Sequence, residues 1–217
     1  MEYHGAGLGA LGEPEHVKQL YSVIAQDYTD RYFGDLSDAP IVDELISRLP
    51  PGARVLDAGC GPGTFTRYLS NKGFLAEGID LSPAMLAAAL EGVPQCSFRE
   101  MDMRSLAYHD GAFAGVLAAY SLIHIPTTDL PRVLGELHRV LQPGGFLLVI
   151  GQSGEPDHIE DEPLAAGERV FVNFLTPARL QEALESAHFS VELLSVKPAS
   201  DDMLMSDGVV WALARSS

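Results

Sequence analysis

Cysteine is almost absent from this chain of 217 residues, which contains only Cys60 and Cys96. Two cysteines at this separation form no CxxC pair, no disulfide framework and no four-cysteine zinc site. Their scarcity fits the reducing conditions of the cytosol. The seven histidines are scattered along the chain, so no metal site is predicted.

Basic residues are also scarce, with 14 Lys and Arg against 30 Asp and Glu and a formal charge of −16. Such a field repels nucleic acid and anionic membranes, so neither is expected as a partner. No Lys or Arg precedes Lys18, which argues against a secretory signal. The longest apolar run, residues 112–126, is interrupted by polar residues and is too short to cross a bilayer. We therefore expect a soluble, cytoplasmic protein, and its oligomeric state stays open.

From residue 53 onward, short β-rich runs alternate with helical runs. The predicted strands are nearly continuous apolar stretches, which indicates a parallel sheet covered by helices on both faces. Ser82 and Pro83 are placed to begin a helix as its cap and its first residue. Strands are predicted over 53–59, 74–80, 96–102, 113–123, 144–151, 190–198 and 208–215, and helices over 63–73, 82–92, 129–141 and 176–189.

The flanking segments have different compositions. Residues 1–13 are rich in glycine and predict a mobile arm before a single domain at 14–217. Apolar residues at helical spacing predict two helices within 14–50. The run 155–162 is acidic and is interpreted as a solvated loop, although as a cap on an active site it would favour neutral or cationic substrates. Phe171 and Phe174 could line a substrate cavity or simply pack in a short strand.

Three alternating glycines follow the first predicted strand. Gly59, Gly61 and Gly63 would let a ligand approach the backbone closely, and ligands of open parallel sheets bind at the carboxyl ends of strands. Thr64 occupies the place of the third glycine in the GxGxxG fingerprint, which disfavours a nicotinamide oxidoreductase. Asp57, just before the glycines, would oppose a phosphate but suit a cationic amine.

Carboxylates also follow the next two predicted strands. Asp80, about 20 residues past the glycines, can accept hydrogen bonds from two ribose hydroxyls. The alternative is a helix cap, for which Ser82 is the better candidate. Asp102 can accept from an adenine amino group while neighbouring methionines pack on the base, or it can be an ordinary loop aspartate.

Taken together, these motifs resemble those of the class I S-adenosylmethionine-dependent methyltransferases, in particular the small-molecule, type-11-like group. The family's glycine, ribose-and-adenine and adenine-amide motifs look like VLDAGCGPG, GIDLSPAML and MDMRSL in this chain, and its fourth- and fifth-strand motifs look like FAGVLAAYSLIHI and RVLQPGGFLLVIG. Its N-terminal lid motif looks like YSVIAQDY, with Ser22 in place of the usual Asp. The resemblance implies a doubly wound, Rossmann-like α/β fold. It further implies a mostly parallel seven-stranded sheet with an antiparallel last strand, lid helices over 14–50 and a variable substrate-side segment over 152–175.

The resemblance also assigns roles to residues. S-adenosylmethionine would be the cofactor and S-adenosylhomocysteine the product. Asp57 would lie near the amino group of the cofactor, and Asp80 would hold its ribose. Tyr21 and Tyr28 would close over it, although both lie on an apolar stripe and could be core residues. The full set expected to bind the cofactor is Tyr21, Tyr28, Asp57, Gly59, Gly61, Gly63, Asp80, Leu81, Met85, Asp102, Met103 and Ala119.

Two candidate catalytic residues lie near the end of the fourth strand. His124 could take a proton from a hydroxyl or an amine, because imidazole titrates near neutrality, or it could only cap a turn or shape the pocket. Tyr120 could contact cofactor or substrate. Methyl transfer depends mainly on alignment and exclusion of water, so a dedicated base is optional.

We therefore predict a methyltransferase acting on an O, N or C nucleophile of a small molecule, mainly by proximity. The alternative is a non-catalytic module that binds S-adenosylmethionine in a regulatory or partner role. Neither the methyl acceptor nor the atom methylated follows from the sequence.

Overall fold

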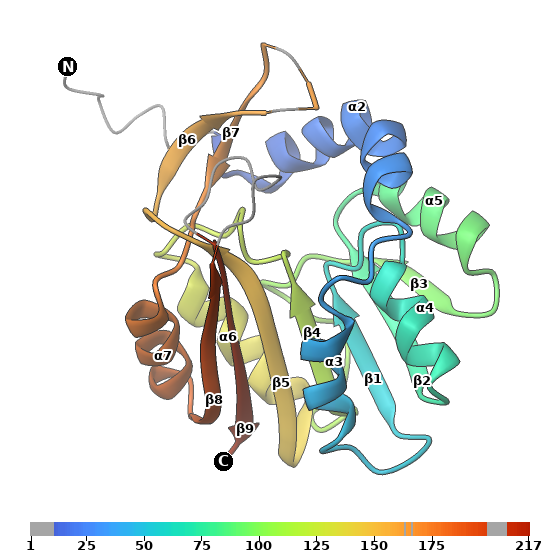
Figure 1. The fold of residues 1–217 in the computed structure, drawn as a ribbon, viewed down its shortest axis with the longest axis vertical. Helices are drawn as coiled ribbons and strands as arrows, with labels where there is room; N and C mark the ends of the chain where they lie inside the picture. The colour runs from blue at the N-terminus through green and yellow to red at the C-terminus, as the bar shows by residue number, and fades with distance from the viewer. Residues whose placement is uncertain (1–10, 163, 166, 199–207) are drawn as a thin grey trace.

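Seven strands form one sheet in the order β3-β2-β1-β4-β5-β9-β8 (Figure 1). The computed structural model describes residues 11–162, 164–165, 167–198 and 208–217. The five strands from β3 to β5 are parallel, and β9 lies antiparallel between β5 and β8. The predicted doubly wound fold with an antiparallel last strand is confirmed. The strands are β1 Arg54–Ala58, β2 Leu75–Asp80, β3 Ser97–Glu100, β4 Phe113–Ala119, β5 Leu141–Ser153, β8 Phe189–Pro198 and β9 Gly208–Ser216.

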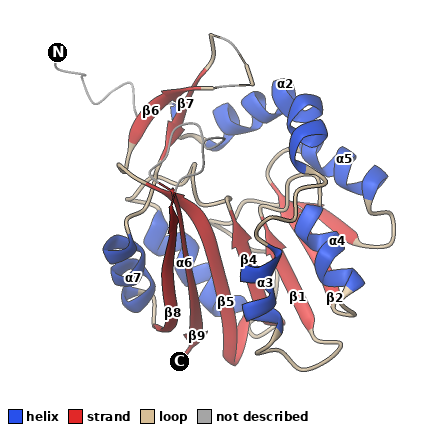
Figure 2. Cartoon of the chain, viewed as in Figure 1, coloured by secondary structure: helices blue, strands red, loops and turns tan. Residues whose placement is uncertain are grey.

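Helices cover both faces of this sheet because successive strand residues point to opposite sides. Leu56 packs into one core with buried residues of α6 and α7, whereas the adjacent Val55 packs into a second core with α3 and α4. Figure 2 shows these two helical layers with the strands between them. The helices are α2 Pro14–Tyr32, α3 Ala39–Ile46, α4 Thr64–Asn71, α5 Pro83–Gly92, α6 Leu130–Val140 and α7 Pro177–Ser186.

Helix starts follow local sequence signals. The Ser82 hydroxyl accepts from Met85 N, as predicted, and Thr176 caps α7 in the same way by accepting from Arg179 N. Each cap precedes a proline at the first helical position, where the missing N–H costs nothing. None of the helices in the described part of the chain is long and apolar enough to cross a membrane.

Two short strands form a separate antiparallel pair, β6 His158–Asp161 and β7 Arg169–Val172. The expectation of a solvated loop across 155–162 is wrong for residues 158–161. The strand β6 contains two carboxylates in four residues and shows no apolar alternation, so nothing local predicts it. Its partner β7 is buried over Val170–Val172 and holds it in place.

The expected arm at 1–13 falls outside the described residues except for 11–13. Gly12 is buried, and a Cβ there would lie 3.2 Å from Pro126 Cγ and 3.3 Å from Phe171 Cγ. The chain is therefore already packed against β7 before α2 begins.

Candidate active site

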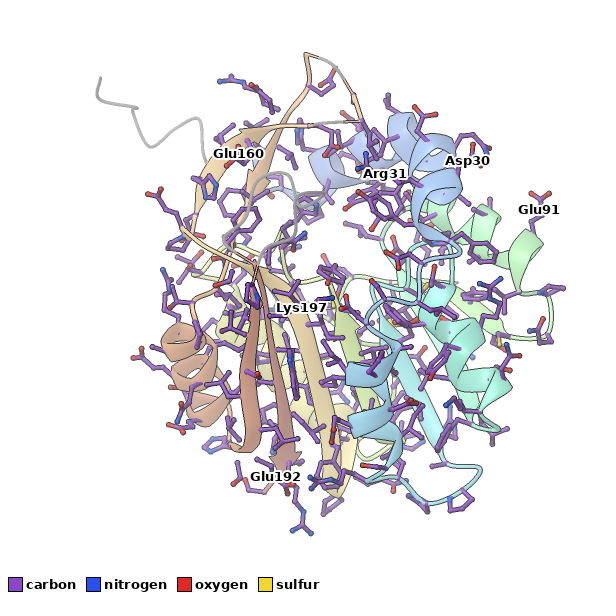
Figure 3. The ribbon with its side chains drawn as sticks, in the orientation of Figure 1. Asp30, Arg31, Glu91, Glu160, Glu192 and Lys197 are labelled. Carbon is purple, nitrogen blue, oxygen red and sulfur yellow. The ribbon has the colours of Figure 1, made fainter. Side chains whose placement is uncertain are left out.

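A cavity of about 760 Å³ lies at the carboxyl ends of the parallel strands, beneath α2 and the β6–β7 pair. Its size falls in the range of roughly 300–1,000 Å³ that is usual for small-molecule sites. Figure 3 shows Lys197, from β8, and Arg31, from α2, reaching toward this space from opposite sides. The cavity is lined by these predicted site residues: Tyr21, Tyr28, Gly59, Gly61, Asp80, Leu81, Met85, Asp102, Met103, Ala119, Tyr120 and His124.

The three alternating glycines have different surroundings. All have positive φ, at 76°, 51° and 86° for Gly59, Gly61 and Gly63, a conformation that favours glycine. A Cβ at Gly59 would lie only 2.2 Å from Ser121 Cβ, and one at Gly63 would be 3.2 Å from its nearest side chains. A Cβ at Gly61 would meet only Tyr28 Cε1, at 4.0 Å, inside the cavity. Gly61 therefore leaves backbone open to a ligand, while the other two allow close packing.

Asp80 joins this glycine loop to the start of α5. One carboxylate oxygen accepts from Gly61 N at 2.9 Å, and the other accepts from Ser82 N at 2.9 Å. Burial raises the pKa of Asp80, while these backbone hydrogen bonds oppose the rise. A carboxylate can accept about four hydrogen bonds, so acceptor capacity is left for a ligand in the cavity.

Asp57 and Gly63 are the two predicted cofactor residues that do not line the cavity. Asp57 is 2% exposed, and its carboxylate accepts from Thr66 Oγ1 at 2.6 Å. Burial raises the pKa of Asp57 to about 7. The structure thus places this carboxylate between β1 and α4. Its partner Thr66 was not predicted, although a polar residue on the buried face of α4 is a usable signal.

His124 is held by both ring nitrogens. Its Nδ1 lies 2.8 Å from Phe171 O, and a carbonyl only accepts, so Nδ1 carries the proton. Burial lowers the pKa of His124 to about 4, so the ring is neutral at pH 7 and Nε2 is an acceptor. The hydroxyl of Tyr21 lies 3.0 Å from Nε2 and donates to it. His124 therefore connects α2, the loop after β4 and β7.

The direction of the hydrogen bond made by Tyr120 is determined in the same way. Its hydroxyl donates to Asp38 Oδ2, and Lys197 Nζ lies 3.4 Å from the other oxygen of Asp38. Asp38 is 6% exposed, and burial raises the pKa of Tyr120 well above its ordinary value. Asp38 and Lys197 were not predicted, because no local pattern marks them and they meet only when the chain folds.

An aromatic row on α2 forms part of the cavity roof. Tyr21, Tyr28 and Tyr32 lie seven and four residues apart, so they share a helix face. Their rings are in contact, with centroids 5.8 Å apart for the first pair and 4.6 Å for the second. Tyr32 was not predicted, although its spacing from Tyr28 is a signal.

The β6–β7 region contributes the rest of the cavity roof. Phe174 lines the cavity, whereas Phe171 packs outside it and contributes its carbonyl to His124. Glu162, at the end of the acidic run, also lines the cavity. Asp102 lines the cavity as well, and its carboxylate accepts from Arg104 N at 2.8 Å.

A methyltransferase-domain family model matches residues 55–145, from β1 into β5. A phosphatidylethanolamine N-methyltransferase from Cereibacter sphaeroides is 31% identical over 151 residues, which cover 67% of this chain and 71% of that relative. The chain belongs to the class I S-adenosylmethionine-dependent methyltransferase family.

Other members of the family match a shorter region. Trans-aconitate 2-methyltransferase from Variovorax paradoxus is 40% identical over 110 residues, covering 49% of this chain and 42% of that relative. The chain spans about half the length of several such relatives.

Solved methyltransferase structures share the fold of this chain. The structure of Burkholderia thailandensis 1,6-didemethyltoxoflavin-N1-methyltransferase, with 1,6-didemethyltoxoflavin and S-adenosylhomocysteine bound, has a TM-score of 0.76 and 21% identity. It covers 100% of this chain, which in turn matches 92% of it. At this identity the likeness shows the fold alone.

Proposed function

We propose that this chain transfers a methyl group from S-adenosylmethionine to a nucleophilic N, O or C atom of a small molecule. The observation that carries the proposal is the open backbone at Gly61 beside the acceptor Asp80, within one cavity that continues under the aromatic row of α2. When bound, S-adenosylmethionine supplies a methyl group on a positively charged sulfur. The names of the relatives include lipid, small-acid and heterocycle substrates, which supports the small-molecule class but leaves the substrate open.

Family membership and cavity position together support the proposed division of the site. The cofactor would lie across the glycine loop and the ends of β2 and β4, with its ribose on Asp80 and its adenine near Asp102. Asp57 and Gly63 would act indirectly, by shaping the loop from outside the cavity. The residues proposed to contact the cofactor directly are Tyr21, Tyr28, Gly59, Gly61, Asp80, Leu81, Met85, Asp102, Met103 and Ala119.

Proximity is proposed as the main catalytic effect. A roof of α2 and the β6–β7 pair excludes water from the reacting groups and holds them together. General-base help from His124 stays a prediction. A pKa of about 4 makes the ring a weak base, and the Tyr21 hydroxyl already occupies Nε2. Any such help would therefore be small, and positioning Tyr21 is the larger role we assign to His124.

The test is turnover by the purified chain. Methyl-labelled S-adenosylmethionine is incubated with a set of amines, phenols, alcohols and carboxylic acids, and S-adenosylhomocysteine and labelled products are measured by mass spectrometry. We expect both to form in equal amounts with at least one acceptor. Tight binding of the cofactor without any turnover would instead favour the non-catalytic module. No binding of the cofactor by the folded chain would contradict both.

A further inference from the structure

We propose that the phenolic oxygen of Tyr120 is the hydrogen-bond acceptor that positions the substrate, and that the site therefore takes an N–H or O–H nucleophile and rejects a carboxylate. This inference rests on the proposed methyltransferase function and narrows its substrate class. It begins from the direction of one hydrogen bond, which the surroundings of Tyr120 determine.

The direction follows from Asp38. A carboxylate only accepts, so the Tyr120 hydroxyl must donate its single proton to Asp38 Oδ2. Asp38 is 6% exposed, and its other oxygen lies 3.4 Å from Lys197 Nζ, so Oδ2 is the oxygen left for Tyr120. Tyr120 lines the cavity, and its oxygen is then left with lone pairs and no further proton to donate. A ligand that donates a hydrogen is matched to this oxygen, whereas a carboxylate would face it lone pair to lone pair.

The backbone holds Tyr120 in one position. Its φ is +55°, which is uncommon for a residue other than glycine and persists only where the surroundings fix it. Its N–H donates to Ile150 O at 2.7 Å, and its hydroxyl is fixed by Asp38. Tyr120 directly follows Ala119, at the end of β4 where the cofactor is expected. The tyrosine oxygen is thus fixed from both ends, as a positioning group must be.

Lys197 does not make this wall a carboxylate site. Its ammonium lies 3.4 Å from Asp38 Oδ1, so the buried carboxylate offsets its charge. With a neutral phenol, the group formed by Asp38, Tyr120 and Lys197 has no net charge. The remaining charged residues that line the cavity are four acids and three bases, which leaves a small excess of negative charge: Asp35, Asp80, Asp102 and Glu162 against Lys18, Arg31 and Arg104. Both features favour a neutral or cationic substrate over an anionic one.

An amine substrate illustrates the proposed methyl transfer. The nitrogen lone pair forms the bond to the methyl carbon, and the electrons of the breaking carbon–sulfur bond stay on sulfur. One N–H of the substrate remains directed at Tyr120 throughout. The proton that the methylated nitrogen loses afterwards passes to water, so Tyr120 neither gains nor loses a proton.

The chain supplies a matched control for the test. Tyr68 on α4 donates its hydroxyl to Asp43 at 2.9 Å, and Lys72 Nζ lies 3.1 Å from the same oxygen. This group has the same three residue types, and none of its members lines the cavity. Tyr68→Phe therefore removes a tyrosine–aspartate hydrogen bond outside the site, at a more exposed carboxylate, and serves as the control for loss of such a bond.

The experiment measures methylation of three series of compounds with matched shapes: amines, alcohols and carboxylates. Their parent compounds are benzylamine, benzyl alcohol and benzoate, and each series is extended with larger aromatic analogues. Wild type, Tyr120→Phe, Asp38→Asn and Tyr68→Phe are compared, with S-adenosylhomocysteine affinity as a second readout. We expect methylation of N–H or O–H compounds and none of carboxylates. In Tyr120→Phe, kcat/KM falls about tenfold with cofactor affinity changed less than threefold, while Tyr68→Phe keeps the wild-type kcat/KM. In Asp38→Asn, the phenolic proton of Tyr120 is no longer held by a carboxylate and can be donated to a ligand. We therefore expect a smaller difference in kcat/KM between N–H or O–H compounds and carboxylates.

Two results would overturn the inference. One is a wild-type preference for carboxylates, and the other is a Tyr120→Phe variant as active as Tyr68→Phe. If no compound turns over, binding of the same series to the complex with S-adenosylhomocysteine is measured by saturation-transfer NMR. A preference for donors supports the inference, and a preference for carboxylates or failure of every donor to bind overturns it. Failure of the wild type to bind S-adenosylhomocysteine would instead contradict the proposed function itself.

Discussion

The hydroxyl of Tyr21 donates to Nε2 of His124 across 3.0 Å, and this bond joins α2 to the loop after β4. The other ring nitrogen of His124 donates to Phe171 O, which belongs to β7. One imidazole thus connects the two segments that form the cavity roof. Removing either hydrogen bond should loosen the roof before it affects the sheet beneath.

Tyr21→Phe keeps the ring contacts of α2 but removes the bond to His124. A neutral hydrogen bond contributes about 1 kcal/mol, so we expect S-adenosylhomocysteine to leave roughly fivefold faster. Stopped-flow dissociation measures this rate. Tyr108→Phe is the control, because it removes a 2.7 Å bond to Glu77 outside the cavity and should leave the rate unchanged. Equal rates for all three proteins would contradict a role for this bond in closing the roof.

His124 should make stability fall in acid. Burial lowers its pKa from 6.5 to about 4, so the unfolded chain takes up this proton first as the pH falls. Its contribution is complete above pH 6.5 and is lost between pH 6.5 and 4, by up to about 3 kcal/mol. Urea unfolding of wild type and His124→Gln across this range measures the difference. If that difference does not change with pH, the ring is not held in the neutral form.

Asp57 should make stability fall as the pH rises, which is the opposite of the effect of His124. Burial raises its pKa from 3.8 to about 7, so the folded chain keeps this proton after the unfolded chain has lost it. Stability relative to Asp57→Asn should therefore decrease as the pH rises from about 4 to 7, by up to about 4 kcal/mol, and then level off. The same unfolding series measures it, and a difference that increases over this range would contradict the burial of Asp57.

Gly59→Ala and Gly61→Ala should fail in different ways, although both strain a positive φ by about 1 kcal/mol or more. A Cβ at Gly59 collides with Ser121, so this variant should be the less stable by at least about 2 kcal/mol. A Cβ at Gly61 projects into the cavity, so this variant should fold but bind S-adenosylhomocysteine at least tenfold more weakly. Thermal unfolding and calorimetry separate the two effects. Equal loss of stability in both variants would mean that Gly61 is also packed against protein.

Most of the fold could be predicted from the sequence because its signals are local. Ser82 and Pro83 mark the start of α5, and the apolar run at 113–119 marks the central strand β4. The strand β6 could not be predicted, since its four residues pair only because β7 is buried beside them.

The site divides in the same way. The residues of the family's motifs could be predicted from the sequence, and ten of the twelve residues proposed to bind the cofactor line one cavity. Asp38, at the start of α3, and Lys197, on β8, are 159 residues apart and meet at that cavity only in the folded chain. The connection from Tyr21 through His124 to Phe171 likewise spans three distant segments, so no spacing in the sequence indicates it.

The most direct test of the account is calorimetric titration of the chain with S-adenosylmethionine and S-adenosylhomocysteine. The comparison is Asp80→Ala, with Asp43→Ala as a control carboxylate outside the cavity. We predict micromolar binding of both compounds to the wild type and the control, and binding at least tenfold weaker to Asp80→Ala. Folded wild-type protein that binds neither compound would contradict the central claim.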